Sequence, residues 1–358
     1  MSSTFWMDRA LSLARRGRGL TAPNPAVGAV LVKDGRLVGE GWHRGPGQPH
    51  AEAEALADAR RRGRDPRGAT LWVTLEPCCH EGGGKRTPPC TKALVEAGVA
   101  EVRAAVADPN PRVSGQGQAF LESAGIRFSW GPRAEEGGEL IADFTTWIRS
   151  SRPFITLKWA QDLAGELRYP GPEGPWISGP ESRVRAHRLR AEHDAVVVGA
   201  GTLRTDDPEL TLRHGEPGPG GPPRRLVWAG SEPLPAGARL FTDDFRSQTW
   251  LIVRPGTPAR LQAPGLVGSR FLEWDGQNWD RLGRDLLAAG FSRLLVEGGP
   301  TLVASLRAQG WWDLSAVFTA PRWVGGPGLA LASPQWTSVG KDILLEGWNP
   351  EASCSPAW

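Results

Sequence analysis

The chain has 358 residues, 40% of them hydrophobic, and a net charge of only +3. This length suggests about two domains of about 150 residues each. Acidic and basic residues are interspersed, without the basic stripe that is typical of a nucleic-acid-binding surface. No run of about 18 apolar residues occurs, so we expect no transmembrane helix. Residues 1–18 carry scattered charges rather than the apolar core of a signal peptide. We therefore interpret them as a mature helix and expect a cytoplasmic protein.

Strand and helix patterns alternate through the first half of the chain. Spacing of apolar residues predicts helices at 4–18, 50–62, 91–97, 116–124 and 135–149, and strands at 27–32, 36–42, 69–75, 102–106 and 126–130. The turn Lys33-Asp34-Gly35 between the first two strands is a strong hairpin signal. Such an alternation indicates a layered α/β domain.

A domain boundary is predicted near Ser150, because a second alternation begins at Phe154. We therefore expect one domain at 1–149 and another at 150–358. In the second domain, strands are predicted at 154–160, 195–198, 226–228, 250–253, 293–296 and 314–319, and helices at 180–191, 281–289 and 301–309. The Gly- and Pro-rich segment 214–223 is predicted to be an exposed loop, and the chain after Gly347 to be irregular.

Three of the four cysteines, Cys78, Cys79 and Cys90, lie close together in the sequence after His50. Without a secretory signal, this grouping favours a metal over disulfides. One His and two Cys can hold zinc and leave its fourth position open for water. A Glu two residues after the His, together with Pro-Cys, is the signature of zinc nucleobase deaminases. We therefore predict His50, Cys78 and Cys90 as zinc ligands. Glu52 is predicted to be the catalytic proton shuttle when zinc-bound hydroxide attacks a ring carbon bearing an amino group.

Two alternatives remain open at this point. A closed structural zinc site could use Cys79 or His80 as a fourth ligand, although it would leave Glu52 without a role. A nucleic-acid deaminase would share the same zinc chemistry. The absence of a basic stripe and the presence of a whole second domain argue against that second alternative.

Several motifs together carry a resemblance to one family. In the first half they are Pro23-Asn24-Pro25-Ala26-Val27-Gly28, His50-Ala51-Glu52, Thr74-Leu75-Glu76-Pro77-Cys78, Thr87-Pro88-Pro89-Cys90 and Asp108-Pro109-Asn110-Pro111. With them the chain resembles the bifunctional deaminase/reductase of riboflavin biosynthesis. The second half is similar to that family's reductase domain at 153–158, 176–177, 189–191, 198–199 with Thr202, 206–208 and 296–299. The resemblance implies an α/β protein with a cytidine-deaminase-like three-layer α/β/α domain, followed by a dihydrofolate-reductase-like α/β domain.

Two consecutive reactions are implied by this resemblance. The first is zinc-dependent deamination of 2,5-diamino-6-ribosylamino-4(3H)-pyrimidinone 5′-phosphate. The second is reduction of the ribosyl side chain by NADPH, which gives 5-amino-6-(5-phospho-D-ribitylamino)uracil. The resemblance also implies a homodimer that acts on a small phosphoribosyl-pyrimidine and binds neither nucleic acid nor a membrane.

Site residues follow from the resemblance as well. Those implied to contact the substrate are Asn24, Lys158, Arg190, Arg213 and Glu297. Those implied to contact NADPH are Trp176, Thr202, Asp206, Gly299, Pro300, Thr301, Leu302, Val303, Ala304 and Ser305. The pattern itself supports a nucleotide near Gly299, because glycines before a helix let the backbone approach a phosphate. Asn24 could equally be a turn residue between two prolines, and Arg190 an ordinary surface residue of its helix.

Some positions depart from the family's pattern. A glycine-rich insertion lies at 81–85, and Cys79 stands where the family usually has Ser. In the second half, Ala164 replaces an Asp, Gly174 a Ser, and Ala229-Gly230 an Asp-Ser pair. These replacements raise the hypothesis of a zinc deaminase whose reductase domain is impaired and acts as a scaffold.

Overall fold

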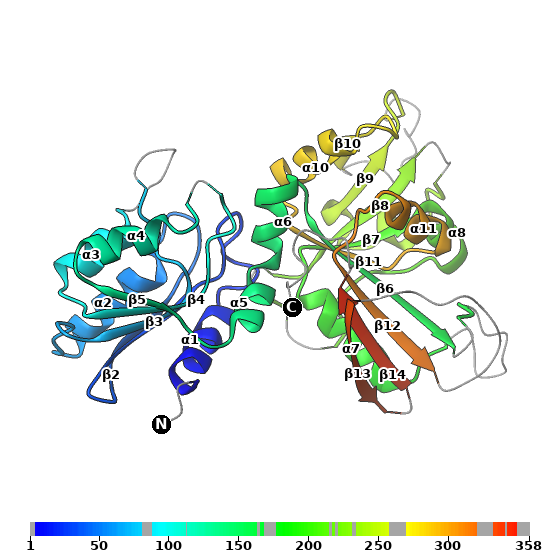
Figure 1. The fold of residues 1–358 in the computed structure, drawn as a ribbon. Helices are drawn as coiled ribbons and strands as arrows, with labels where there is room; N and C mark the ends of the chain where they lie inside the picture. The colour runs from blue at the N-terminus through cyan, green and yellow to red at the C-terminus, as the bar shows by residue number, and fades with distance from the viewer. Residues whose placement is uncertain are drawn as a thin grey trace. The chain divides into compact units, whose positions relative to one another are not determined.

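The chain consists of two compact units, and the first ends at Ser150 while the second begins at Ser151 (Figure 1). The computed structural model describes residues 4–80, 88–111, 113–162, 165–167, 177–214, 217–218, 221–230, 234–257, 270–320, 332–340 and 342–348. Each unit is built around its own β-sheet. Among the described helices, none is long and apolar enough to cross a membrane.

The first unit contains a five-stranded sheet in the order β2-β1-β3-β4-β5. Its strands are β1 (Gly28–Lys33), β2 (Arg36–Trp42), β3 (Thr70–Leu75), β4 (Glu101–Val106) and β5 (Arg127–Trp130). Its helices are α1 (Phe5–Arg15), α2 (Ala51–Arg61), α3 (Cys90–Glu96), α4 (Gln116–Ser123), α5 (Ala134–Leu140) and α6 (Ala142–Ser150). Strand β1 runs antiparallel to both of its neighbours, β2 and β3. Strands β3, β4 and β5 are parallel to one another.

The alternation of apolar residues along β1 explains the three layers of this unit. Leu31 belongs to a core shared with α2, α3 and α4, whereas Val30 belongs to a core shared with α1 and α5. Successive side chains of a strand point to opposite faces, so both faces are covered by helices. At Gly28 a Cβ would lie 2.1 Å from the carbonyl oxygen of Ala10. Glycine there lets α1 lie directly against the backbone of β1.

The second unit contains a nine-stranded sheet in the order β10-β9-β8-β7-β11-β6-β12-β14-β13. Its strands are β6 (Phe154–Asp162), β7 (Ala195–Gly199), β8 (Arg224–Gly230), β9 (Thr249–Val253), β10 (Arg270–Glu273), β11 (Arg293–Val296), β12 (Leu314–Ala320), β13 (Ala332–Val339) and β14 (Asp342–Trp348). Its helices are α7 (Pro180–Ala191), α8 (Ala200–Asp206), α9 (Arg239–Thr242), the 3-10 turn η1 (Arg246–Gln248), α10 (Trp279–Ala288) and α11 (Pro300–Ala308). The strands from β10 to β12 in this order are all parallel. Strand β14 runs antiparallel to both of its neighbours, β12 and β13.

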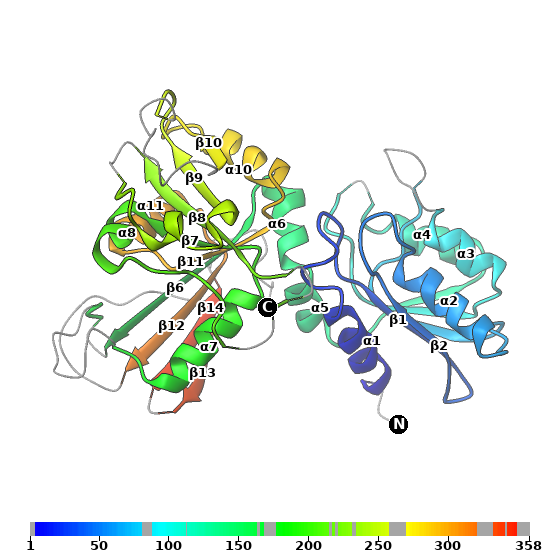
Figure 2. The ribbon, with the colours of Figure 1, turned by 180° about the vertical axis from the view of Figure 1, so that it is seen from behind.

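Helices cover both faces of this second sheet as well. Leu286 of α10 and Leu306 of α11 pack into one core. On the opposite face, Leu189 of α7 packs with Leu295 of β11, whereas the preceding residue, Leu294, belongs to the first core. Helix α7 lies along β14 and β13 (Figure 2).

Val296, the last residue of β11, pairs with Leu157 of β6. The next residue of β6, Lys158, therefore lies at the carboxyl end of β11. In open α/β sheets, ligands bind outside such carboxyl ends.

The structure differs from the sequence-based prediction in several elements. The helix predicted at 135–149 is two helices, α5 and α6, separated at Ile141. The helix predicted from His50 begins at Ala51, and His50 is its N-cap. The prediction missed α8, α9, β10, β13 and β14, and Trp348, expected to begin an irregular tail, belongs to β14. The predictions for the chain beyond Trp348 lie outside the described residues.

Candidate functional site

His50, Cys78 and Cys90 come together at one end of the first sheet. Nδ1 of His50 lies 3.5 Å from Sγ of Cys78 and 3.3 Å from Sγ of Cys90. All three candidate ligand atoms lie within 4.8 Å of one another. A tetrahedral zinc, with bonds of about 2.0 Å to nitrogen and about 2.3 Å to sulfur, places such atoms about 3.5 Å apart. The three side chains therefore fit zinc in both their chemistry and their spacing.

Local structure explains why these three residues meet. His50 caps α2, Cys78 follows β3, and Cys90 is the first residue of α3. The backbone N–H of Cys90 donates to Sγ of Cys78 at 3.4 Å, and the N–H of Thr91 donates to the Cys78 carbonyl at 3.2 Å. Donors at the start of a helix stabilise thiolates, which are the form that binds metal.

Glu52 lies in the first turn of α2 and is buried, with only 3% of its surface exposed. Its carboxyl contacts the thiol of Cys90. Burial raises the pKa of Glu52, and the negative charge of Cys78 raises it further. A raised pKa means that this carboxyl holds a proton more readily than an exposed one, which suits a group that takes up a proton and passes it on.

Asn24 and His43 form a hydrogen-bonded pair beside the same site. Nδ1 of His43 lies 3.0 Å from the carbonyl oxygen of Pro49, which can only accept, so Nδ1 carries the proton. Nε2 then accepts from Nδ2 of Asn24 at 3.1 Å. The His43 ring also packs edge-on against His50, with ring centroids 5.3 Å apart. The amide oxygen of Asn24 is therefore the atom suited to accept a hydrogen bond from a ligand. No role was expected for His43, because nothing in its sequence spacing marks it.

The alternative fourth ligands are not part of this group. Sγ of Cys79 lies 3.9 Å from the side-chain oxygen of Gln116, on α4. Over the described residues, the only cluster with metal-ligand spacing joins His50, Cys78 and Cys90. The geometry thus favours an open site over a closed structural one.

In the second unit, Glu297 accepts hydrogen bonds from two cationic side chains at the carboxyl end of β11. Arg190 of α7 donates from Nε at 2.6 Å and from Nη2 at 3.1 Å, and Lys158 of β6 donates at 3.5 Å. Nη1 of Arg190 also donates to the carbonyl of Thr211 at 2.8 Å. Burial alone would raise the pKa of Glu297, but Arg190 and then Lys158 outweigh it and hold that pKa well below its usual range. Arg190 is thus a fixed part of this cluster rather than a surface residue.

Arg213 lies beside this cluster. Its backbone N–H donates to Nδ1 of His187 at 3.2 Å, and the His187 ring lies 5.1 Å from that of His214. Burial, followed by the charges of Arg190 and Arg213, lowers the pKa of His187 to about 4. A neutral imidazole can accept this hydrogen bond, and the surrounding positive charge suits a phosphate.

The residues expected to contact NADPH lie on α8 and around the start of α11. Thr202 and Asp206 are four residues apart on α8 and so share a helix face. Oγ1 of Thr202 accepts the N–H of Gly299, the N-cap of α11, at 2.9 Å. Of the α11 residues expected to contact NADPH, Leu302 and Val303 are partly buried and pack against the hydrophobic core that contains Leu306. Trp176 lies outside the described residues, as do Ala164 and Gly174.

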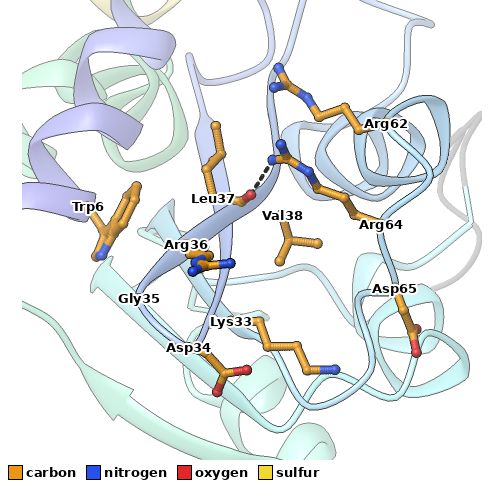
Figure 3. Close-up of a pocket in the computed structure, with 10 residues that line it drawn as sticks. All are labelled: Trp6, Lys33, Asp34, Gly35, Arg36, Leu37, Val38, Arg62, Arg64 and Asp65. Atoms are coloured by element: carbon orange, nitrogen blue, oxygen red, sulfur yellow. Dashed lines mark hydrogen bonds between the residues drawn. The ribbon is translucent and has the colours of Figure 1, made fainter.

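A separate pocket of about 1030 Å³ lies at the β1–β2 hairpin and contains none of the predicted site residues (Figure 3). Arg36 and Arg64 are among the residues that line it, and Arg64 donates to the carbonyl of Leu37. The pocket adjoins Arg62, just after the end of α2, whereas His50 caps the beginning of that helix. Eleven helical residues separate the two by about 16 Å, so the pocket is distinct from the candidate metal centre.

Comparisons with known proteins identify the family. The family model described as the cytidine and deoxycytidylate deaminase zinc-binding region matches residues 1–106, and the RibD C-terminal domain matches residues 153–339. The riboflavin biosynthesis protein RibD of Aquifex aeolicus is 40% identical over 95% of this chain and 92% of its own length. The chain belongs to the RibD family. RibD of Escherichia coli is 36% identical over 93% of this chain and 91% of its own length.

Solved RibD structures agree with the fold. The structure of Acinetobacter baumannii RibD has a TM-score of 0.77 and 31% identity, and covers 97% of this chain and 98% of that one. A Thermotoga maritima diaminohydroxyphosphoribosylaminopyrimidine deaminase/5-amino-6-(5-phosphoribosylamino)uracil reductase has a TM-score of 0.77 and 32% identity, and covers 96% and 97% of the two chains. These matches confirm the expected fold class, a deaminase-like α/β domain joined to the RibD reductase domain.

As a RibD protein, the chain is a bifunctional enzyme with zinc-dependent deaminase and NADPH-dependent reductase activities. The hypothesis of an impaired, scaffold-like reductase domain is not supported, because the RibD reductase domain is matched over 153–339 and RibD relatives align along nearly the whole chain. One of the departures also has a packing explanation. Ala229 is buried in an apolar cluster that includes Val227 and Phe241, so a methyl group suits that position.

Proposed function

We propose that the chain catalyses two consecutive steps of riboflavin biosynthesis. Residues 1–149 would deaminate 2,5-diamino-6-ribosylamino-4(3H)-pyrimidinone 5′-phosphate. Residues 150–358 would then reduce the ribosyl group of the product to ribityl with NADPH. The observation that carries this proposal is the His50–Cys78–Cys90 group beside buried Glu52, in a chain that also matches the RibD reductase domain.

In the deaminase, His50, Cys78 and Cys90 would hold zinc. When bound, zinc supplies the Lewis acidity that lets water attack an amino-bearing ring carbon at neutral pH. Glu52 takes the proton of the attacking water and delivers it to the leaving amino group, which departs as ammonia. Asn24, held by His43, orients the pyrimidine by accepting a ring N–H at its amide oxygen.

In the reductase, Arg190, Arg213 and Lys158 would face the phosphoribosyl substrate. When bound, NADPH supplies the hydride. A guanidinium forms paired, charge-assisted hydrogen bonds with phosphate, and Glu297 holds Arg190 in a fixed orientation through two bonds of 2.6 and 3.1 Å. Residues proposed to bind NADPH are Thr202, Asp206 and the segment 299–305, which contains the start of α11, together with Trp176.

A cytoplasmic homodimer that acts on small molecules, without nucleic acid or membrane, completes the proposal. Strand β13 supports the dimer because it is the last strand at one edge of the nine-stranded sheet. Its residues 335–338 are all exposed, and Trp336 is 63% exposed. An exposed edge strand with a large apolar side chain is suited to contact another chain. Light scattering of the unaltered protein and of Trp336→Lys would test this surface, since only the altered protein should dissociate.

Turnover of the diaminopyrimidine phosphate tests the two activities together. NADPH absorbance and ammonia release would be followed in parallel on zinc-loaded protein. Matching signals support both sites, and Glu52→Gln should silence both, because the reductase then lacks its substrate. Supplying Glu52→Gln with deaminated substrate should restore NADPH oxidation alone. Ammonia release without NADPH oxidation would contradict the reductase activity. Absence of both ammonia release and NADPH oxidation would contradict the whole proposal.

A further inference from the structure

Glu76 lies between β3 and Cys78, and its carboxylate is buried, with 3% of the residue exposed. Four backbone N–H groups of the segment after β4 donate to it. Oε1 accepts from Gly117 at 2.9 Å and Gln118 at 3.2 Å, and Oε2 accepts from Gly115 at 3.0 Å and Asp108 at 3.2 Å. One side chain therefore binds both ends of the loop 108–118, whose last three residues form the first turn of α4.

The close contact at Gly117 shows how tightly this loop is held. A Cβ there would lie 2.2 Å from the carbonyl oxygen of Pro77 and 3.0 Å from Oε1 of Glu76. Gly115, with φ of 78°, adopts a left-handed conformation that glycine reaches without strain. The loop backbone thus lies directly against the segment that leads into Cys78.

The loop carries polar side chains next to the metal centre. Oδ1 of Asp108 accepts the N–H of Asn110 at 2.8 Å, which shapes a tight turn. Asp108 is close enough to Cys78 and His80 to interact with their charges. The motif Asp108-Pro109-Asn110-Pro111 had no role assigned to it from the sequence, and its first residue, Asp108, lies within range of the charge of Cys78.

We propose that Glu76 is a positioning residue of the deaminase, which holds the loop 108–118 against the metal centre so that Asp108 and Asn110 form one wall of the substrate site. This inference rests on the proposed deaminase function. The carboxylate acts through the loop backbone and touches neither the substrate nor the metal. Its loss should therefore weaken substrate binding more than it slows the chemical step.

Glu76→Gln is the most direct test, because the amide keeps the side-chain shape but turns an accepting oxygen into an NH₂ that faces two N–H donors. We expect KM for the diaminopyrimidine phosphate to rise about tenfold or more, and kcat per bound zinc to stay within about threefold. Zinc content should stay at that of the unaltered protein. Amide hydrogen exchange at 108–118 should become faster. Glu76→Asp, which keeps the charge but shortens the side chain, should give an intermediate KM and covers the case in which Glu76→Gln does not fold.

Asp58→Asn is the matched control in the same unit. Oδ2 of Asp58 also accepts a backbone N–H, from Glu40 at 3.0 Å, and pairs with Arg62 at 2.6 Å. This carboxylate binds the backbone of β2 and makes no bond to the described residues of the loop 108–118. Its removal should therefore change stability and leave KM unaltered.

Two results would overturn the proposal. If KM is unchanged in Glu76→Gln while kcat falls in proportion to zinc content, Glu76 supports only the metal site. If exchange at 108–118 is unchanged, Glu76 does not hold the loop. Absence of ammonia release by unaltered zinc-loaded protein would instead overturn the deaminase function, and with it the substrate wall, while the exchange data would still report on the loop itself.

Discussion

Replacing Glu297 by Gln should destabilise the second unit, because it removes the negative charge shared by Arg190 and Lys158. The side chains of Glu297 and Arg190 are each only 11% exposed, and that of Lys158 is 17% exposed. Breaking a buried ion pair by removing one partner costs about 3–5 kcal/mol. The Gln oxygen can still accept one hydrogen bond, and Arg190 retains its bond to Thr211. We therefore expect a loss of about 2–3 kcal/mol in the free energy of unfolding.

The pH dependence of this loss gives a second check. Because Arg190 and Lys158 outweigh burial and keep the pKa of Glu297 well below its usual range, the carboxylate stabilises the fold at every pH above its unfolded pKa of about 4.3. That stabilisation is lost as pH falls below this value. The difference between unaltered protein and Glu297→Gln should thus be constant from about pH 6 to 8 and shrink below about pH 4.

Urea unfolding followed by tryptophan fluorescence would measure the effect, since the core of the second unit contains Trp311 and Trp312. The exposed pair Arg281–Asp285, at 65% and 41% exposure, provides the control. Asp285→Asn should cost no more than about 0.5 kcal/mol. A loss below about 1 kcal/mol in Glu297→Gln, or one equal to that of the control, would refute the argument that this cluster behaves as a buried network.

Three further predictions concern other parts of the molecule. Glu52→Gln should slow ammonia release by about 10²–10⁴-fold at unchanged zinc content; loss of zinc in this variant would contradict a role as proton shuttle. Gly28→Ala should cost about 1–3 kcal/mol or more in unfolding of the first unit, because its Cβ would lie 2.1 Å from the Ala10 carbonyl oxygen; an unchanged Tm would refute this contact. The pKa of about 4 at His187 means that the unfolded chain binds the proton more readily, so stability should fall by up to about 3 kcal/mol as pH drops from about 6.5 to 4. A His187→Gln variant with the same pH profile would exclude this histidine as the cause.

Local signals explain which parts of the metal centre could be predicted. His50 caps α2, Cys78 follows shortly after the end of β3, and Cys90 begins α3. Helix starts and strand ends are readable from sequence, and the ligand types specify their own chemistry. His43 could not be predicted in the same way. Its bond to Asn24 depends on how the segment after β2 folds back, which no local pattern encodes.

Long-range pairing explains what was missed in the second unit. Strand β13 is polar and exposed, and it forms a strand through its pairing with β14. Strand propensity depends strongly on such neighbours. Helix α8 contains Gly201 and Thr202, both poor helix formers, so its sequence does not predict a helix. The helix is nevertheless secured by the buried Leu203, which packs in an apolar cluster against the sheet.

Strand β2, the edge strand of the five-stranded sheet, has a different kind of edge from β13. The guanidinium of Arg64 donates a hydrogen bond to the carbonyl of Leu37, and the carboxylate of Asp58 accepts one from the N–H of Glu40. These are the groups through which an edge strand recruits a strand from another chain. Because they are already bonded within the same domain, this edge resists intermolecular strand addition and protects the deaminase domain from aggregation through its sheet.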